Sequence, residues 1–199
     1  MNKLTIIIPC KNEEHNMEAL LQSVQWADEI LVVDSYSTDK TVEIANKYSA
    51  RILEHDYNYS ASQKNWAIPQ ASHDWILLVD ADERISENLK VEILAILEKG
   101  PGKKGYWINR ENWFMGKKVS FGGVQGDKVI RLFHKDCRYE DKKVHAEVIV
   151  DGAVGLLKNK LVHNSYKNLG HYLEKVALPF DVGCNIKLYL SESILDLIA

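Results

Sequence analysis

The first half of the chain alternates between short continuous apolar runs and stretches in which apolar residues recur at helical spacing. The runs are rich in aliphatic and β-branched side chains, as in strands buried on both faces of a parallel sheet. They lie at residues 4–8, 30–33, 51–53 and 76–79. Helices are predicted between them, beginning near Asn16, near Asp39 and at Tyr59. This alternation predicts an α/β fold with a mainly parallel sheet and right-handed crossovers.

The second half of the chain predicts one more helix at residues 87–97 and strands at 106–109 and 129–133. Residues 161–199 are expected to form a C-terminal helical segment, and its last part, 186–198, is amphipathic. Such a helix normally packs on its own domain. In some proteins it docks on a membrane surface instead, and the mixed charge of this segment favours the first interpretation.

The bulk composition narrows the range of functions. The 199 residues suit one domain, and the net charge of −3 gives no general attraction to polyanions, so we expect no nucleic-acid partner. The three scattered cysteines form neither a disulfide framework nor a zinc motif, which suits a reducing cytosol. The N-terminus lacks a signal-peptide core, and no apolar run reaches the length of a membrane span. We therefore expect a cytoplasmic protein, and we leave open a peripheral contact with the inner face of the cytoplasmic membrane.

Two carboxylates follow the apolar run at residues 76–79. Asp80 and Asp82 are two positions apart, so in extended backbone they point the same way, and the small Ala81 between them allows a ligand to approach closely. Adjacent like charges are costly unless a cation compensates them. Mg²⁺ and Mn²⁺ prefer oxygen ligands and are often shared between carboxylates and phosphates. The sequence therefore suggests a metal that binds a diphosphate, whereas the plainer interpretation is a solvated acidic loop.

Other polar residues are expected at the same edge of the sheet, because the carboxyl ends of parallel strands meet there. Asp34 follows the second strand, and its carboxylate can accept the imide N–H of a uracil; the alternative is an Asx turn or a helix cap. Lys11 or Lys64 can neutralise phosphate charge. The chain has neither the Gly-rich dinucleotide-binding motif after its first strand nor a P-loop motif.

Several of these stretches together resemble family 2 glycosyltransferases with the GT-A fold. The family likeness lies in IIIPCKNEE at residues 6–14, VVDSYSTDKT at 32–41 and VDADE at 79–83. Three more stretches resemble the branch of β-1,4-glucosyltransferases that build the lipopolysaccharide inner core. They are NWFMG at 112–116, RLF at 131–133 and VHAE at 144–147. Together the stretches span about the first 150 residues.

The resemblance implies an inverting transferase that moves a hexose, glucose in that branch, from a UDP-sugar to a saccharide or lipid-linked saccharide acceptor, with Mg²⁺ or Mn²⁺. It implies a nucleotide-sugar-binding half at residues 1–100 and an acceptor-binding half at 101–160 of a single GT-A domain. Asp34 would contact the uracil, and Asp82 would be the closer metal ligand, with Asp80 beside it. The remaining residues implied for the nucleotide sugar are Pro9, Lys11, Glu13, Lys64 and Ala81.

Transfer to an acceptor hydroxyl requires a carboxylate base. Glu147 is the favoured candidate and Asp127 the next, with Glu140 and Asp141 left open. Alternation in a strand across residues 144–148 would place His145 and Glu147 on one face.

Three further residues have a functional and a plainer interpretation. His145 would order a phosphate or a sugar hydroxyl, or else is structural. Arg131 would contact the diphosphate or the acceptor, or else is an ordinary surface residue of a strand. Trp113 would stack on an acceptor sugar, or else supports a loop.

Two other functions compete with sugar transfer. A sugar-1-phosphate nucleotidyltransferase also uses paired aspartates, but it would carry a Gly-rich loop after the first strand, and residues 9–14 contain no glycine. A nucleotide-sugar-binding protein without turnover would keep the same donor site. Transfer of labelled sugar separates these alternatives.

Overall fold

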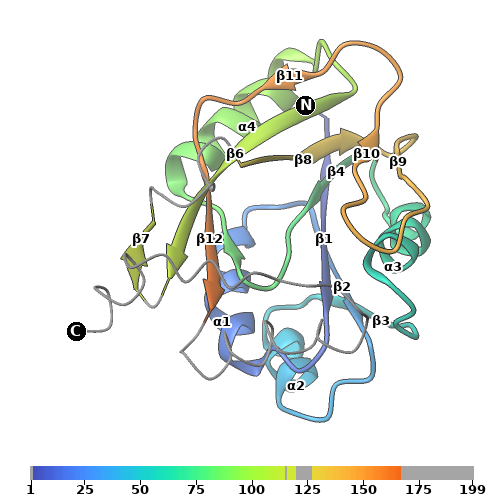
Figure 1. Cartoon of the computed structure of the whole chain (residues 1–199), viewed down its shortest axis with the longest axis vertical. Coiled ribbons are helices and arrows are strands. Elements are labelled where there is room, and N and C mark those ends of the chain that lie inside the picture. The colour runs from blue at the N-terminus through green and yellow to red at the C-terminus, as the bar shows by residue number, and fades with distance from the viewer. Residues whose placement is uncertain (1, 115, 120–126, 167–199) are drawn as a thin grey trace, which may run out of the picture. The chain divides into compact units, whose positions relative to one another are not determined.

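The structure is a computed structural model that describes residues 2–114, 116–119 and 127–166 (Figure 1). Its helices are α1 (Glu14–Val24), α2 (Thr41–Lys47), α3 (Ser60–Ala67), the 3₁₀ helix η1 (Ile68–Gln70) and α4 (Glu87–Lys99). Its strands are β1 (Leu4–Cys10), β2 (Glu29–Asp34), β3 (Arg51–Glu54), β4 (Trp75–Leu78), β5 (Glu83–Arg84), β6 (Gly105–Phe114), β7 (Lys117–Lys118), β8 (Lys128–His134), β9 (Arg138–Tyr139), β10 (Val148–Ile149), β11 (Gly155–Leu156) and β12 (Leu161–Tyr166).

The main sheet has the strand order β3-β2-β1-β4-β8-β6-β12-β5. β3, β2, β1 and β4 run parallel, which confirms the fold class predicted for the first half of the chain. β8 then pairs antiparallel with β4, and β6 pairs antiparallel with β8. The order reverses at β1, which has β2 on one side and β4 on the other. Ligands of open α/β sheets bind at such a reversal, beyond the carboxyl ends of the strands.

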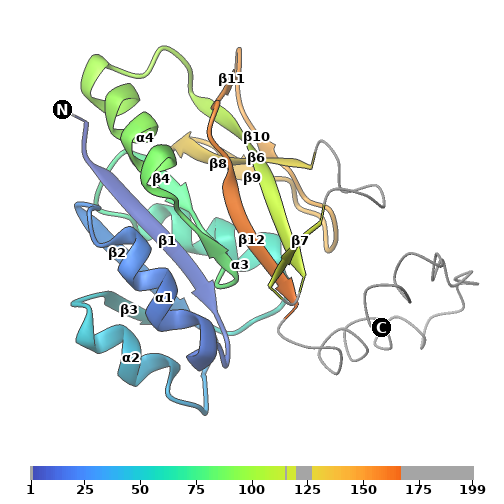
Figure 2. The ribbon, with the colours of Figure 1, turned by 90° about the vertical axis from the view of Figure 1, so that its left-hand side faces the viewer.

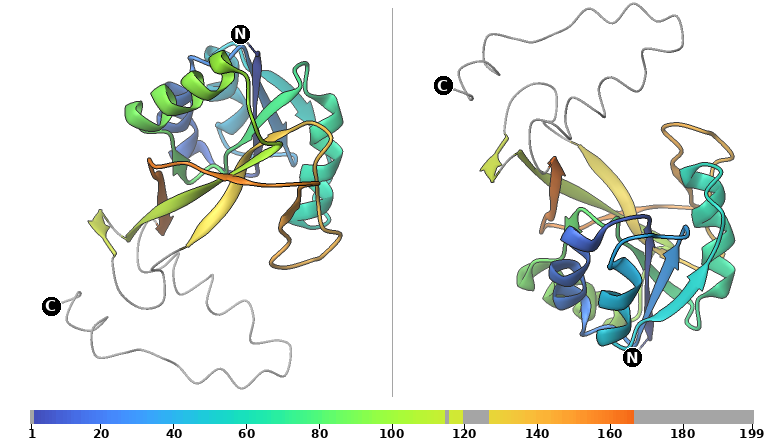
Figure 3. Two further views of the ribbon diagram at one scale, coloured as in Figure 1. Left: turned by 90° about the horizontal axis from the view of Figure 1, so that it is seen from above. Right: turned by 90° about the horizontal axis from the view of Figure 1, so that it is seen from below.

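Helices cover both faces of the sheet. Figure 2 shows α1, α2 and α4 on one face and α3 on the other, and the views in Figure 3 agree. The apolar spacing of α1 explains its place, because its four buried residues all face the sheet. They are Met17, Leu20, Leu21 and Val24. On the opposite face, α3 buries Ala61 and Ala67, and these small residues let the helix lie close to the strands.

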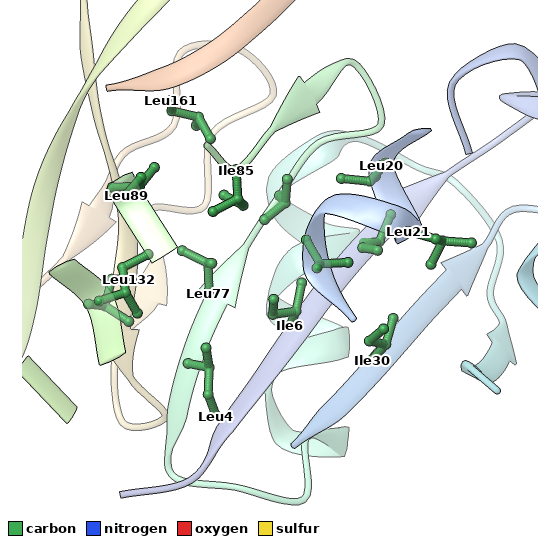
Figure 4. Packing of buried hydrophobic residues seen from close by; sticks show 14 of the residues in the cluster. Leu4, Ile6, Leu20, Leu21, Ile30, Leu77, Ile85, Leu89, Leu132 and Leu161 are labelled. Atoms are coloured by element: carbon green, nitrogen blue, oxygen red, sulfur yellow. The ribbon is translucent and has the colours of Figure 1, made fainter. Parts of the chain in front are cut away.

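The larger core also includes the first residue of the last described strand. Leu161 of β12 is fully buried in the same cluster as Ile85, Leu89 and Leu132 (Figure 4). Burying one leucine side chain contributes about 1.5–3 kcal/mol. This contact therefore fixes the start of β12 against the core of the domain. Leu161 lies 81 residues after Asp80 in the sequence, so the contact is a long-range one.

Two expectations from the sequence are corrected. Residues 144–147 form a loop and not a strand, and His145 has a φ of 52°, which interrupts extended backbone. Residues 161–166 form β12 and not the start of a helical segment, because β12 pairs with β5 and lies beside β6. The remainder of that predicted segment, residues 167–199, lies outside the described residues.

The two expected halves of the domain share one sheet, since β4 from the first half pairs with β8 from the second. Residues 1–165 form one compact unit. Among the helices of the described residues, none combines the length and the apolar character of a membrane span.

Candidate active site

Two loops at the carboxyl edge of the sheet hold each other through hydrogen bonds. The backbone N–H of Asn12 donates to Ser37 Oγ at 2.8 Å, and Thr38 N–H donates to Asn12 Oδ1 at 2.8 Å. Asn12 has a φ of 53°, which its short polar side chain tolerates better than a branched one would. Glu13 N–H donates to Thr41 Oγ1 at 2.8 Å at the start of α1. These bonds fix the edge at which the nucleoside was predicted to bind.

Asp34, the last residue of β2, holds the loop that carries Ser37. Its side chain is fully buried and accepts hydrogen bonds from the backbone N–H and the hydroxyl of Ser37. The Cys10 thiol lies 3.6 Å from Asp34 Oδ1, and burial next to this carboxylate raises the pKa of Cys10. The arrangement matches the turn that the sequence offered as an alternative to uracil recognition.

Asp80 lies between two cations. Lys64 Nζ is 3.0 Å from its Oδ1, and Arg131 Nη2 contacts its Oδ2. Burial by itself would raise the pKa of Asp80, but the charges of Arg131 and Lys64 outweigh it and hold that pKa well below its usual range. Both oxygens of this carboxylate are therefore engaged by protein cations.

A second carboxylate beneath Asp80 was not predicted from the sequence. Glu83 is fully buried, accepts a bond from the Asp80 N–H at 2.9 Å, and lies 2.7 Å from Arg131 Nη2. Burial raises the pKa of Glu83, and the Arg131 charge opposes that rise. Arg110 approaches the same carboxylate at 3.8 Å. Arg131 is therefore a buried bridge between two acidic residues, and the interpretation of it as an ordinary surface residue is wrong.

Asp82 is placed beside a histidine that the sequence analysis missed. β12 pairs antiparallel with β5, which sets His163 opposite Glu83, and the Asn164 N–H donates to the Asp82 carbonyl at 2.8 Å. His163 Nε2 consequently lies 3.6 Å from Asp82 Oδ2. The carboxylate oxygen is a ligand that both Mg²⁺ and Mn²⁺ prefer, and an imidazole nitrogen at this separation can join it as a ligand of a transition metal such as Mn²⁺.

A pocket of about 360 Å³ is lined by Asp80, Arg110 and Arg131, among others. Its walls come from α3, β6, β8 and the loop between β9 and β10, and Tyr139 and Trp107 supply aromatic surface. Six residues predicted from the sequence line it together: Lys64, Asp80, Asp127, Arg131, His145 and Glu147. The loop at residues 144–147 therefore brings His145 and Glu147 to one pocket without the predicted strand.

The candidate bases differ in their surroundings. Asp127 is held by Arg110 Nη2 at 2.9 Å and by Asn112 Nδ2 at 3.4 Å. Glu147 is exposed at the rim of the pocket, and its backbone N–H donates to Glu140 Oε2 at 3.3 Å. Asp141 accepts a hydrogen bond from the Tyr59 hydroxyl. Of these carboxylates, Glu147 and Asp127 line the pocket.

Other predicted residues lie outside the pocket lining. Trp113 is on the β6–β7 hairpin, where its indole N–H donates to Glu111 Oε1 at 3.1 Å. Ala81 is buried, and its carbonyl accepts a bond from Arg84 at 2.8 Å. The nucleoside-pocket candidates lie at the end of β1 and in the loop after it: Pro9, Lys11 and Glu13.

Comparison with known proteins extends this picture. The profile of the family described as Glycosyl transferase family 2 matches residues 5–149. The lipopolysaccharide core biosynthesis glycosyltransferase LpsC of Rhizobium meliloti (strain 1021) is 29% identical over 159 residues, which cover 76% of this chain and 59% of LpsC. The protein called uncharacterized glycosyltransferase RT0209 of Rickettsia typhi (strain ATCC VR-144 / Wilmington) is 33% identical over 138 residues, or 68% of this chain and 47% of RT0209. The chain thus spans about half to three-fifths of these relatives.

The fold is shared with a solved glycosyltransferase. The crystal structure of residues 1–349 of S. aureus TarS superposes with a TM-score of 0.59 at 16% identity, covering 82% of this chain and 60% of that one. This likeness supports the fold alone, which is GT-A. The family match covers the sheet edge, the paired aspartates and all the residues that line the pocket described above. The chain therefore belongs to glycosyl transferase family 2.

Proposed function

We propose that this chain transfers a hexose from a UDP-sugar to a saccharide acceptor, with inversion at the anomeric carbon and with a divalent metal. The observation that carries the proposal is the pocket lined by Lys64, Arg131 and Glu147. The contact between Asp82 and His163 adds a carboxylate–imidazole pair to it. Such a transfer needs cations beside the diphosphate, ligands for a metal and a carboxylate base. These groups would supply all three.

The donor would lie along the carboxyl edge, with its nucleoside over Pro9, Lys11 and Glu13 and its uracil near Asp34. The crystal structures of TarS in complex with UDP and with UDP-GlcNAc concern a protein of the same fold and support a UDP-linked donor. Lys64 and Arg131 would place positive charge beside the diphosphate. Because Asp80 already binds both cations, we assign it the role of orienting them and not that of the principal metal ligand.

Asp82 and His163 would hold the metal, since their ligand atoms lie 3.6 Å apart. The Asp82 oxygen suits both Mg²⁺ and Mn²⁺, and the imidazole nitrogen favours the transition metal Mn²⁺. The described residues contain no cluster of three protein ligands, so the diphosphate and water would complete the shell. When bound, the ion neutralises the charge that develops on the departing diphosphate.

Glu147 would remove the proton from the acceptor hydroxyl as the new glycosidic bond forms. It is exposed at the pocket rim, where a carboxylate can meet a hydroxyl, whereas Asp127 is already bound to Arg110 and Asn112. The likeness to LpsC supports a lipopolysaccharide core sugar as the acceptor. Glucose is the first donor to try, because the sequence resembles the β-1,4-glucosyltransferase branch of the family.

Radiolabelled UDP-glucose tests the proposal, with truncated lipopolysaccharide core saccharides as acceptors, with and without Mn²⁺. We expect transfer that requires both the metal and an acceptor. Glu147→Gln serves as the matched inactive variant, because it keeps the shape and removes the base. Binding of UDP-glucose without transfer to any such acceptor would favour a binding protein without turnover.

A further inference from the structure

We propose that Asn112 is a positioning residue for His163: its side-chain amide fixes the ring tautomer so that Nε2 presents a lone pair toward Asp82. The inference rests on the proposed function for its purpose, a metal between Asp82 and His163. Its structural content is a chain of contacts from Arg110 through Asp127 and Asn112 to His163.

The first step in this chain sets the orientation of an amide. Arg110 holds Asp127 twice, because its backbone N–H donates to the Asp127 carbonyl at 2.8 Å and its Nη2 lies 2.9 Å from Oδ1. The other carboxylate oxygen of Asp127 accepts from Asn112 Nδ2 at 3.4 Å. A carboxylate only accepts hydrogen bonds, so the NH₂ group of Asn112 must face it. The amide oxygen of Asn112 then points the opposite way.

The second step sets the proton position on the ring. Asn112 Oδ1 lies 2.7 Å from His163 Nδ1. An amide oxygen has no hydrogen to donate, so the hydrogen of this bond is on Nδ1. In a neutral imidazole, one nitrogen carries the hydrogen and the other a lone pair. In its neutral form, His163 therefore carries its lone pair at Nε2, the nitrogen that lies 3.6 Å from Asp82 Oδ2.

The consequence is a site prepared for a cation. A divalent ion that binds between the two side chains would accept the Nε2 lone pair and offset the charge of Asp82. The opposite tautomer would place an N–H next to Asp82, and that hydrogen would have to leave before a metal could bind. Hydrogen-bond partners of metal-binding histidines fix the tautomer in many proteins, and removing one typically costs about 10–100-fold in metal affinity. Asn112 is 7% exposed, so solvent has little access to compete for its amide.

The test compares Asn112→Leu with wild type. Leucine keeps the approximate shape and removes the acceptor. Asn109→Leu, the same change on the same strand β6, is the matched control. In protein labelled with ¹⁵N-histidine, long-range ¹H–¹⁵N spectra at pH 8 report the His163 tautomer without metal, with His163→Gln identifying the signal. Mn²⁺ affinity is then measured by electron paramagnetic resonance.

We expect the Nδ1–H tautomer in wild type and in Asn109→Leu, and the Nε2–H tautomer in Asn112→Leu with Mn²⁺ affinity lower by about 10–100-fold. The double variant Asn112→Asp with Asp127→Asn exchanges amide and carboxylate and keeps an acceptor at Nδ1, so it should restore the wild-type tautomer. Thermal unfolding verifies that each variant is folded.

An Nε2–H tautomer in wild type, or an unchanged tautomer in folded Asn112→Leu, would overturn the inference. Failure of the proposed function looks different. In that case the tautomer and the Mn²⁺ affinity follow Asn112 as expected, while no sugar is transferred to any saccharide.

Discussion

At the amino ends of the parallel strands, Glu29 is surrounded by groups that all belong to the fold, whereas at the carboxyl ends the acidic residues adjoin an open pocket. Thr5 Oγ1 lies 2.6 Å from Glu29 Oε2, Ser72 donates from both its N–H and its hydroxyl at 2.7 Å, and Arg51 lies at 3.1 Å. Glu29 thus ties β1, β2, β3 and the loop before β4 together. At the other end, Asp80 is tied in the same manner to Lys64 and Arg131, whereas Glu147 is exposed and Asp82 lies beside His163.

Each end also has a hollow, and the hollow at the amino end is the larger, at about 480 Å³ against about 360 Å³. Size therefore does not identify the functional end. The carboxyl end differs because it has side chains that can react or bind a ligand. They are an exposed carboxylate and a carboxylate–imidazole pair, whereas the hydrogen-bond network around Glu29 is saturated. The comparison predicts that substitutions at one end change activity and those at the other change stability.

Glu147→Gln should have the largest effect and should affect activity alone. Loss of a general base typically lowers turnover by a factor of about 10²–10⁴. We expect UDP-glucose binding and the unfolding temperature to stay at wild-type values, because Glu147 is exposed. Steady-state kinetics and calorimetry provide the measurements. A nearly normal rate would move the base to Asp127 and would weaken the contrast between the two ends.

Asp82→Asn should abolish the metal dependence of UDP binding. The variant keeps the size of the side chain but removes the charge that a divalent ion needs. We expect a Mn²⁺ titration of UDP binding to become flat while the variant stays folded, because asparagine keeps the size of the side chain at this half-buried position. Wild-type affinity in the presence of Mn²⁺ would contradict the assignment of Asp82 as a ligand.

Leu161→Ala should affect stability and the metal site together. Truncating a buried leucine costs about 2–5 kcal/mol, and Leu161 is fully buried at the start of the strand that carries His163. Urea unfolding gives the loss of stability, and a Mn²⁺ titration of the folded fraction gives the loss of affinity. Leu156→Ala is the control, because that leucine is exposed. Unchanged Mn²⁺ affinity in folded Leu161→Ala would show that β12 does not position the site.

At the amino end, acid should destabilise the fold through Glu29. Burial would raise the pKa of Glu29, but the hydrogen bonds from Thr5, Ser72 and Arg51 outweigh it and lower that pKa from 4.5 to about 2. A depressed carboxylate pKa stabilises the fold above the unfolded value and loses that contribution as pH falls from 4.5 through 2. We expect Glu29→Gln to remove about 1–3 kcal/mol at neutral pH and to flatten the acid limb of the stability curve.

The same Glu29→Gln variant should retain its sugar-transfer activity at neutral pH, where it remains folded. Urea titrations at several pH values measure the stability, and the transfer assay measures the activity. A large loss of activity in folded Glu29→Gln would break the division of roles between the two ends of the sheet.

The order of strands and helices in the first hundred residues was predictable from the sequence, except for the short helix η1 and the two-residue strand β5. Each of the predicted elements is determined by the spacing of apolar residues within one short segment. The edge that carries Asp34, Asp80 and Asp82 followed from the same pattern, since parallel strands end on one side. Lys64, Arg131, His145 and Glu147 could be named as candidates through their residue types and the family resemblance, and the structure brings these four to one pocket.

The tertiary structure alone decided what each of these groups binds. Arg131 bridges Asp80 and Glu83, and His163 lies beside Asp82. These contacts result from strand pairings that join segments 48 to 81 residues apart. Such pairings depend on which apolar faces pack together. Leu161, for example, is buried in one cluster with Ile85 and Leu89. No single segment of the sequence determines this packing. The local pattern of the chain thus determined where its ligand edge lies, and long-range packing determined which side chains form a site there.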